Sequence, residues 1–498
     1  MFQEYKKIRN KIRKYNPLDI VSQAISILNT PDLIYTEKYS LYPPWLLMLL
    51  VEWALLEQGN EQYTTKPLSL KNFNILVNML KDLDGKQQLP SHEGGLLLLF
   101  RKMAFQQFWW RKELNKCDFG RQVELLVTLP ETPYFNESFI NTTNIDLHTY
   151  IRLTVALVSL FVTSPKALYT TKIPFRSLQS HINHKTVDHF FKLISLGPRE
   201  AAAFLKENKW AKSSLQQQLF LETPLQMAPL LNINEKYFSY ARALLYHSAQ
   251  NLAYDLLRAN DPYVFAQNFS KVFQKYVERS LKYAGLDYIT EDGIKSRTKS
   301  SNKVVDFLVV ENGINVFIEA KAVEMPALGK ASHEKNIIAD KTKTHLVKAI
   351  DQALSTANDL NTTECGIDVS KPNRNFLLIA TYKDMYVGGG RDYYNFIAKD
   401  KIDNILNKYG KDSLLIPIDN VYTISAEELD VIVTHLNEGN VTIRKLLETA
   451  VENDAKPSTG KLLLSQHLPG SVRGDELPAY LEKATKLAFK DTVALLAN

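Results

Sequence analysis

The chain has 498 residues and a formal net charge of +6, so it should hold two or three domains and contact nucleic acid, if at all, through a local basic patch. Its only cysteines are Cys117 and Cys365, which excludes a disulfide framework or a cysteine-rich zinc site. The N-terminal segment lacks the apolar core of a signal peptide and no apolar run is long enough to span a bilayer, so we expect a soluble, cytoplasmic protein with no membrane partner.

Residues 1–255 are predicted to form a mainly helical domain. Apolar residues recur at helical spacing in several segments, separated by loops rich in Pro, Asn, Gly and Thr. These segments are Pro44–Glu57, Leu70–Leu83, Gly94–Leu114 and Leu147–Phe161. No metal-ligand cluster or glycine-rich phosphate loop stands out in this part of the sequence. We expect a recognition, regulatory or assembly module.

Arg242 and His247 stand in a helical segment of this domain with four residues between them. This spacing resembles the R-x4-H motif of the HEPN ribonucleases, and the resemblance implies an RNase in which both residues line a dimer cleft. The motif is short, and arginine and histidine are common on helix surfaces. An ordinary helix is therefore the alternative interpretation.

A long helix is predicted to begin at Asp261-Pro262, an N-cap residue followed by proline in the first turn. An apolar stripe at helical spacing follows, and Gly285 ends it. The stripe consists of Phe265, Phe269, Val272, Phe273, Tyr276 and Val277. Gln274 and Glu278 lie one turn apart on a different face of this helix.

Four basic residues precede the next predicted strand, with no acidic residue among them. They are Lys295, Arg297, Lys299 and Lys303. A basic loop at this place predicts binding to a nucleic-acid backbone without base readout. A solvated, mobile loop is the alternative, because four charges make a small patch.

The segment Lys303–Lys321 predicts a β-hairpin. Asn312-Gly313, between runs rich in Val, Ile and Phe, is a strong signal for a two-residue turn. With that turn, residue 311 pairs with residue 314, and counting back places Asp306 opposite Glu319, with Cβ atoms about 5 Å apart. Lys321 shares their face because it lies two residues beyond Glu319. The other face is apolar and predicts a core surface.

Two carboxylates at this separation suit a hard divalent cation. Mg²⁺ prefers oxygen ligands, and one or two carboxylates commonly hold it together with water and phosphate. A lysine beside them can orient or help deprotonate an attacking water and stabilise charge that develops on phosphorus. The alternative is an edge hairpin that carries a solvated salt bridge.

After the hairpin, a helix is predicted with its N-cap at Asp340, an apolar side, and an opposite side that carries Lys341, His345, Lys348 and Gln352. The strands predicted beyond it are Phe376–Thr381, as a buried closing strand, Leu414–Ile418 and Val421–Ile424. Ser425-Ala-Glu-Glu428 is a capping box that opens another helix. Residues 436–498 are predicted to form a helical C-terminal extension.

Asp306, the hairpin and Glu319-Ala320-Lys321 resemble the motif of the PD-(D/E)XK nuclease superfamily. The predicted elements from about Asp261 to Thr381 also follow the order of that family's core, which is helix, three-stranded meander, helix and strand. The resemblance implies a restriction-endonuclease-like α/β core, a mixed sheet flanked by helices, in residues 256–435. This core would be fused to the helical domain 1–255. Val305 stands where the motif's name puts proline, a change that many members tolerate.

The resemblance implies that Asp306, Glu319 and the carbonyl of Ala320 hold Mg²⁺, for which Mn²⁺ would substitute, and that Lys321 serves the attacking water. Family members often carry an acid on the first helix, which makes Glu278 a candidate catalytic residue; a solvated helix surface is the alternative interpretation of Glu278. The expected activity is hydrolysis of phosphodiester bonds by a DNA endonuclease; RNA is the alternative substrate. The fusion resembles a prokaryotic antiviral defence effector, with a protein partner or a homo-oligomer as expected assemblies. An inactive nuclease fold that binds nucleic acid or acts as a scaffold is the rival interpretation.

Overall fold

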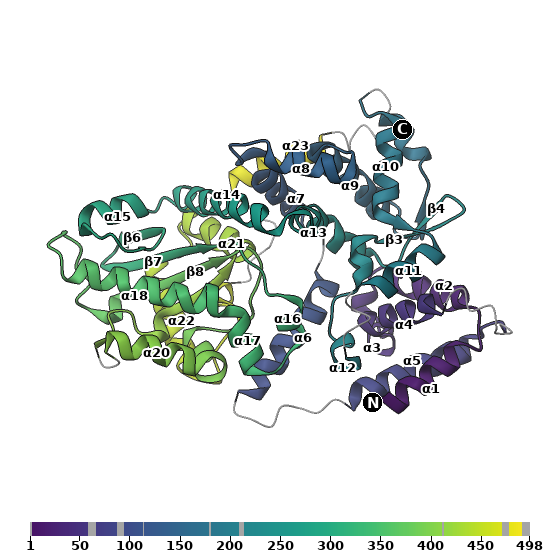
Figure 1. Ribbon diagram of the computed structural model, residues 1–498, viewed down its shortest axis with the longest axis horizontal. Helices are drawn as coiled ribbons and strands as arrows, with labels where there is room; N and C mark the ends of the chain where they lie inside the picture. Colours follow the sequence, from purple (N-terminus) through teal and green to yellow (C-terminus); the bar gives the residue numbers. More distant parts are fainter. Residues whose placement is uncertain are drawn as a thin grey trace. The chain divides into compact units, whose positions relative to one another are not determined.

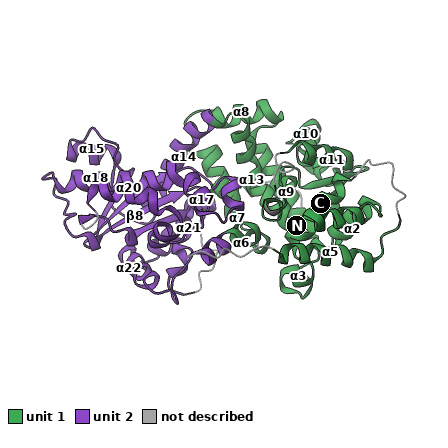
Figure 2. Cartoon of the chain, turned by 60° about the horizontal axis from the view of Figure 1, so that its bottom comes forward, with its two compact units in different colours: residues 1–89, 102–262, 483–498 green, residues 90–101, 263–482 purple. Residues whose placement is uncertain are grey.

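The computed structural model describes residues 2–57, 66–86, 94–112, 114–178, 181–208, 214–410, 413–470 and 478–490, apart from the side chain of Gln216. The chain divides into two compact units (Figure 2). Unit 1 comprises residues 1–89, 102–262 and 483–498, and unit 2 comprises residues 90–101 and 263–482. Residues 436–482, expected as part of a separate extension, group with unit 2.

Unit 1 is mainly helical, as its apolar periodicity predicts (Figure 1). Its α-helices are α1 (Phe2–Ile12), α2 (Pro17–Leu28), α3 (Lys38–Leu41), α4 (Pro44–Leu56), α5 (Leu70–Gly85), α7 (Lys116–Val123), α8 (Tyr134–Thr143), α9 (Leu147–Thr163), α10 (His184–Ile194), α11 (Pro198–Glu207), α12 (Leu215–Gln218) and α13 (Arg242–Asn260). Helices α6 (Gly95–Arg111) and α23 (Ala479–Phe489) contribute residues to both units. The helices predicted from periodicity correspond to α4, α5, α6 and α9.

A small sheet in unit 1 was not predicted. Its strands are β1 (Tyr169–Thr170), β2 (Ser195–Leu196), β3 (Leu230–Ile233) and β4 (Lys236–Ser239), in the order β1-β4-β3-β2. The turn between β3 and β4 is formed by Asn234 and Glu235, with φ angles of 51° and 61°. Because this turn contains no glycine, the usual hairpin signal is missing from the sequence.

Membrane-spanning potential was assessed over the described residues. No single helix in that part of the chain has the length and apolar composition needed to cross a bilayer, and α8 with α9 meets these criteria only as a pair bent by 66°. Most residues of α9 are buried inside unit 1, as in the core helix of a globular domain.

Unit 2 is built on a five-stranded mixed sheet. Its strands are β5 (Tyr288–Thr290), β6 (Phe307–Glu311), β7 (Ile314–Lys321), β8 (Asn375–Thr381) and β9 (Val421–Ser425), in that order across the sheet. The first three strands form an antiparallel meander, whereas β7, β8 and β9 are parallel to one another. Strand β8 therefore lies inside the sheet; the expectation that it closes the sheet is wrong, because β9 pairs with its far side.

Helices surround this sheet. The α-helices of unit 2 are α14 (Pro262–Tyr283), α15 (Glu291–Thr298), α16 (Ala327–Ala331), α17 (Lys335–Thr342), α18 (Lys348–Asn361), α19 (Gly390–Asp392), α20 (Lys399–Tyr409), α21 (Ala426–Asn437) and α22 (Ile443–Asp454). Two π-helical segments, η6 (Lys343–Val347) and η8 (Tyr393–Ala398), precede α18 and α20. Helix α14 begins at the predicted proline, and Gly285, with φ of 69°, follows its end.

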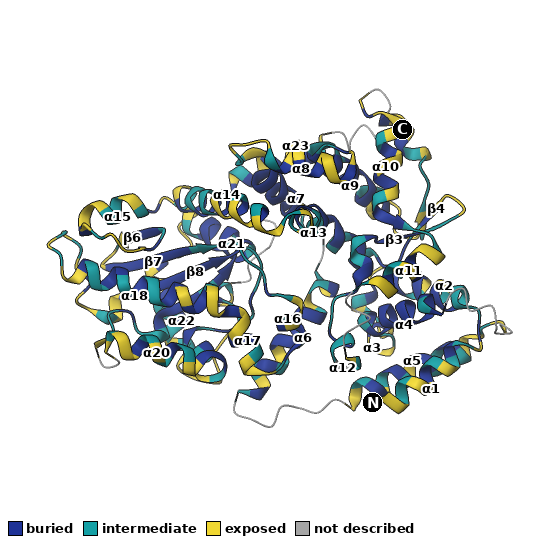
Figure 3. Cartoon of the chain, in the orientation of Figure 1, coloured by how far each residue is buried: buried dark blue, intermediate teal, exposed yellow. Residues whose placement is uncertain are grey.

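The core of unit 2 lies on both faces of the sheet (Figure 3). On one face, Val277 of α14 and Val433 of α21 line an apolar cavity of about 20 Å³ together with Ile318 of β7. On the opposite face, α18 packs on β7 and β8. Every residue of β8 is buried, as expected for a parallel strand covered on both sides.

The predicted helix start at Asp340 is wrong. Asp340 lies inside α17, where its carboxylate pairs with Lys401 at 2.6 Å. The helix begins earlier, at Lys335, and passes through η6 into α18. Aspartate favours helix starts, but an exposed aspartate with a lysine partner is also accommodated within a helix.

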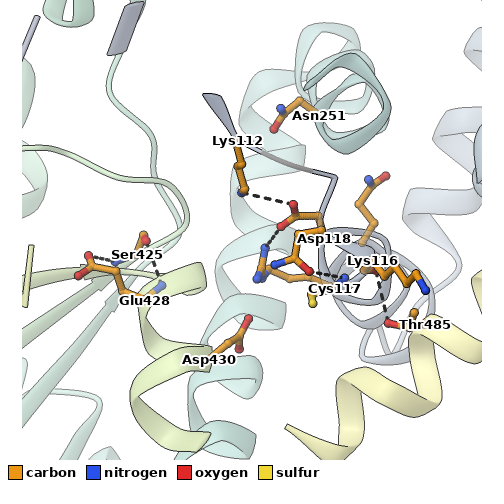
Figure 4. A network of polar contacts seen from close by, with 12 residues as sticks. Lys112, Lys116, Cys117, Asp118, Asn251, Ser425, Glu428, Asp430 and Thr485 are labelled. Atoms are coloured by element: carbon orange, nitrogen blue, oxygen red, sulfur yellow. Dashed lines mark hydrogen bonds and ion pairs between the residues drawn. The ribbon is translucent and has the colours of Figure 1, made fainter. Parts of the chain in front are cut away.

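The predicted strand Leu414–Ile418 does not form, whereas its neighbour Val421–Ile424 corresponds to β9. Pro417 lies within this predicted strand, and proline has no main-chain N–H to donate to a neighbouring strand. The capping box forms as predicted: Glu428 N donates to Ser425 Oγ at 3.3 Å, and Ser425 N donates to the Glu428 carboxylate (Figure 4).

Candidate active site at the end of the β6–β7 hairpin

The hairpin β6–β7 forms with the predicted register. Its turn, Asn312-Gly313, has φ angles of 50° and 77°, the left-handed conformation that this type of two-residue turn requires. Phe307 pairs with Ile318, so Asp306, the residue before β6, comes opposite Glu319. A slip of one residue would turn every side chain to the other face of the sheet. The turn therefore sets the position of both acids.

Asp306 is held by the main chain and by a glutamine. Its Oδ2 accepts a hydrogen bond from Ala320 N at 2.7 Å, and its Oδ1 accepts one from Gln274 Nε2 of α14 at 2.9 Å. Burial raises the pKa of Asp306 to about 6, against the opposing effects of the Ala320 hydrogen bond and the Lys321 charge. The charge of Glu291 adds to this rise in pKa.

Glu319 is 2 % exposed. Its Oε1 accepts an ion-pair hydrogen bond from Lys321 Nζ, and its Oε2 accepts a hydrogen bond from Gln352 Nε2 at 3.1 Å. Burial, with a smaller contribution from the charge of Asp306 and against the charge of Lys321, raises the pKa of Glu319 to about 7. The two acids thus lie close enough for one to oppose the ionisation of the other.

Helix α18 forms hydrogen bonds with the main chain of the segment that precedes Asp306. Gln352 Nε2 also donates to the carbonyl of Val304 at 2.6 Å, and Thr356 Oγ1 accepts from Val305 N at 3.1 Å. The face of the hairpin that carries the acids is closed by this helix, and Leu308 on that face is fully buried. Glu319 is therefore buried beneath this helix, whereas Asp306 is half-buried.

Lys321 is 18 % exposed at its side chain and belongs to a group of basic residues. Burial lowers the pKa of His345, in η6, and the charges of Lys321 and Lys348 lower it further. The charges of Lys321 of β7 and Lys348 of α18 therefore both act on His345 of η6.

Glu278 does not contact either acid of the hairpin among the described residues. Its Oε1 accepts hydrogen bonds from Tyr288 Oη of β5 at 2.7 Å and from Lys282 Nζ at 3.0 Å. Gln274, one turn earlier on α14, is the residue that reaches Asp306. Of the two positions considered on this helix, the structure brings only Gln274 to the hairpin acids.

The expected basic loop is in large part a helix. Lys295 and Arg297 lie in α15, and Lys299 ends it with φ of 51°. Lys295 Nζ pairs with Glu291 at 2.6 Å, whereas Lys303 is exposed in the segment that leads to the hairpin. The expectation that Lys295 and Arg297 lie in a loop is wrong, because this segment begins with a helix cap and acidic residues in its first turn, which favour a helix.

Glu291 is an acid that sequence reasoning missed. It opens α15 directly after the N-cap Thr290, whose Oγ1 accepts a hydrogen bond from Gly293 N at 3.4 Å. Its charge acts on Asp306 and raises the pKa of that carboxyl. A Thr-Glu-Asp-Gly sequence signals a helix start, but nothing in it signals proximity to an acid fifteen residues later in the chain.

Arg242 and His247 lie in α13 of unit 1 and have structural partners there. The Arg242 guanidinium donates to the carbonyls of Pro165 and, at 3.3 Å, of Ala167, which follow α9. The His247 ring packs on Trp109, with ring centroids 4.7 Å apart. Both residues thus take part in the packing of unit 1.

The candidate metal ligands are Asp306, Glu319 and the carbonyl of Ala320. Among the described residues, no group of three or more His, Cys, Asp or Glu side chains is arranged to hold a metal ion. Two carboxylates suit Mg²⁺, which keeps several of its waters, better than zinc, which requires three or four nitrogen, sulfur or oxygen ligands from the protein. The charge of Asp306 raises the pKa of Glu319, and a cation held by both carboxylates would oppose that effect.

Comparisons of the chain with models of known protein families, with curated proteins and with solved structures found no match.

Proposed function

We propose that the chain is a metal-dependent nuclease that hydrolyses phosphodiester bonds within DNA strands. The observation that supports this proposal is the position of the half-buried Asp306 opposite the buried Glu319 on neighbouring chain segments, with Lys321 paired to Glu319. The surrounding order of α14, a three-stranded meander, α18 and a parallel strand is the order expected of the PD-(D/E)XK superfamily.

Asp306, Glu319 and the carbonyl of Ala320 would hold Mg²⁺, with Mn²⁺ as a substitute. When bound there, the metal supplies Lewis acidity toward the phosphoryl group and lowers the pKa of water. Lys321 contributes a positive charge beside these acids, where it orients the attacking water and stabilises negative charge on the phosphoryl oxygens. The amides of Gln274 and Gln352 hold the two carboxylates in place through one hydrogen bond each.

A fold that only binds nucleic acid or serves as a scaffold is the rival proposal. Two carboxyl groups whose pKa values are raised by burial lower the stability of the folded chain at neutral pH. A binding-only protein gains nothing from acids that would repel a polyanion. This argument favours catalysis over scaffolding and applies equally to DNA and RNA as substrate.

The proposal is tested with purified chain and supercoiled plasmid in Mg²⁺, in Mn²⁺ and in chelator. We expect cleavage with either metal and none with chelator. Asp306→Ala and Lys321→Ala should each lower the rate by about 100-fold or more, because each removes a charge that acts on the transition state. Glu319→Gln should weaken Mg²⁺ binding in titration calorimetry.

Glu311→Gln is the matched control, because Glu311 lies on the same hairpin at its opposite end. It should leave the rate unchanged. Metal-dependent cleavage at the wild-type rate by the Asp306→Ala, Glu319→Gln double variant would refute the assignment of the active site. Cleavage of RNA but not of plasmid DNA would show that the substrate is RNA.

A further inference from the structure

Three basic side chains meet beside the proposed active site, namely Lys321 of β7, His345 of η6 and Lys348 of α18. Gln352 of α18 donates to Glu319, the ion-pair partner of Lys321, and Lys348 lies one helical turn before Gln352, with His345 three residues earlier. The charges of both lysines also lower the pKa of His345. His345 is half-buried and makes no hydrogen bond to another residue in the described ranges. Lys348 is exposed and forms no ion pair with any residue that the structure describes. These two residues are therefore available to a ligand.

A π-helical segment places His345 at this position. Lys343–Val347 interrupts what would otherwise be a continuous α-helix from Lys335 to Asn361. A π turn widens the helix and re-aims the side chains that it carries, and such turns occur frequently at functional sites. Leu346 and Val347 in this segment are buried, so the turn is packed into unit 2 and is not a frayed end.

We propose that Lys321, His345 and Lys348 form a phosphate-binding cluster that holds the nucleic-acid backbone at the active site. The proposal rests on the nuclease function proposed above and names the surface on which the substrate lies. Lys321 pairs with Glu319, whereas Lys348 has no acidic partner among the described residues, so an anion beside Lys348 would offset the repulsion between the two lysines. A phosphodiester is such an anion, and it accepts hydrogen bonds from both lysine and imidazole.

Other basic residues of unit 2 fit this role less well. Lys295 already pairs with Glu291 at 2.6 Å. The charges of Lys343 and Lys341 act on the carboxylate of Asp340, so acidic neighbours partly neutralise them. Lys343 belongs to the same π segment as His345, which makes it a matched control for the cluster.

The experiment measures binding of a short fluorescein-labelled DNA duplex by anisotropy, in chelator, over a range of salt concentrations. Wild type is compared with His345→Ala, Lys348→Ala, the double variant and Lys343→Ala. We expect the double variant to bind about tenfold more weakly, because it loses two hydrogen bonds to a charged group. The slope of log affinity against log salt should fall by about 0.9 when the Lys348 contact is lost.

The loss should be the same on two unrelated DNA sequences, because backbone contacts carry no base information. Lys348→Arg should retain the wild-type slope, since it keeps the charge, and Lys343→Ala should bind within about twofold of wild type. Melting temperatures establish that each variant is folded. Lys348 is exposed, so its substitution tests the cluster even if the His345 variant fails to fold.

An unchanged affinity and salt slope in Lys348→Ala and in the double variant would overturn the cluster. An equal loss in Lys343→Ala would also overturn it, because the effect would then come from net charge alone. Binding in chelator is independent of cleavage. If the chain cleaves plasmid with Mg²⁺ but these variants keep the wild-type salt slope, only the proposed phosphate-binding cluster is refuted. If the salt slopes change as expected but the chain does not cleave, only the proposed nuclease function is refuted.

Discussion

Asp306 and Glu319 retain their protons at a pH where most carboxyl groups are ionised, because burial raises their pKa values to about 6 and about 7. An acid whose pKa is higher in the folded than in the unfolded state makes folding less favourable as the pH rises between the two values. Protons also compete with a metal ion for the carboxylate oxygens. Both effects follow from placing two acids inside the fold.

We therefore expect the metal-free chain to lose stability as the pH rises from about 4 to about 7. At a Mg²⁺ concentration about 100 times the Kd, metal binding should add about 2.7 kcal/mol of stability. At a fixed Mg²⁺ concentration, the rise in Tm should be larger at pH 8 than at pH 6. Thermal unfolding at both pH values, with and without Mg²⁺, measures this difference.

The Asp306→Asn, Glu319→Gln double variant should lose both the Mg²⁺ effect and its pH dependence. An increase in Tm that is equal at the two pH values, or that persists in the double variant, would show that the metal binds elsewhere.

The pairing of Asp306 with Glu319 could be predicted because Asn312-Gly313 sets the register and the rest is counting along two strands. The contacts of Gln274 and Gln352 with these acids could not be predicted. They depend on how α14 and α18 pack against the sheet, and neither periodicity nor turn chemistry encodes that packing.

At the scale of one helix, α14 uses two neighbouring polar residues in different ways. Gln274 donates to Asp306, whereas Glu278 accepts from Tyr288 and Lys282. We expect Gln274→Ala to lower the cleavage rate about tenfold, because it removes a hydrogen bond to a charged group that must stay in position. Initial rates over a range of plasmid concentrations measure this effect as a change in kcat.

Glu278→Gln is the companion variant on the same helix. Its cleavage rate should stay within about twofold of wild type, because a surface substitution with such partners changes little beyond local stability. A strong loss of activity in a folded Glu278→Gln protein would contradict the geometry described here and return Glu278 to the active site.

Helices with a clear apolar periodicity, such as α4 and α9, or with a capping box at their start, such as α21, could be predicted from the sequence. Elements without such a signal were not. The β3–β4 hairpin turns on Asn234-Glu235 without a glycine, and η6 looks like ordinary helix because its apolar residues keep roughly helical spacing. The apolar run that contains Pro417 looks like a strand, yet it lacks a donor that a ladder needs.

At the scale of the whole molecule, unit 1 is assembled from three separate stretches of chain, of which the last is 483–498. The described part of that stretch packs on α7: the ring of Phe489 meets Phe119 edge-on at a centroid distance of 5.8 Å. Thr485 Oγ1 donates to the carbonyl of Lys116 at 3.5 Å (Figure 4). No shift in composition marks this return, so the sequence predicted only a helical extension from residue 436 onward.

We expect Phe489→Ala to destabilise unit 1 by about 2 kcal/mol, because it removes a half-buried ring and an aromatic pair. Leu487→Ala is the matched control on the same helix, since Leu487 is 43 % exposed. Its effect should be below about 0.5 kcal/mol. Chemical denaturation followed by tryptophan fluorescence measures both values, and equal losses would show that Phe489 does not complete the core of unit 1.

The late return of the chain to α7 also affects the course of synthesis on the ribosome. Phe119 is translated hundreds of residues before Phe489, so part of its apolar surface stays uncovered during most of elongation. Exposed apolar surface on a nascent chain is what chaperones bind and what promotes aggregation. A polypeptide released before its last helix is translated would keep that surface exposed, and proteases that remove unfolded chains would act on it in preference to the full-length protein.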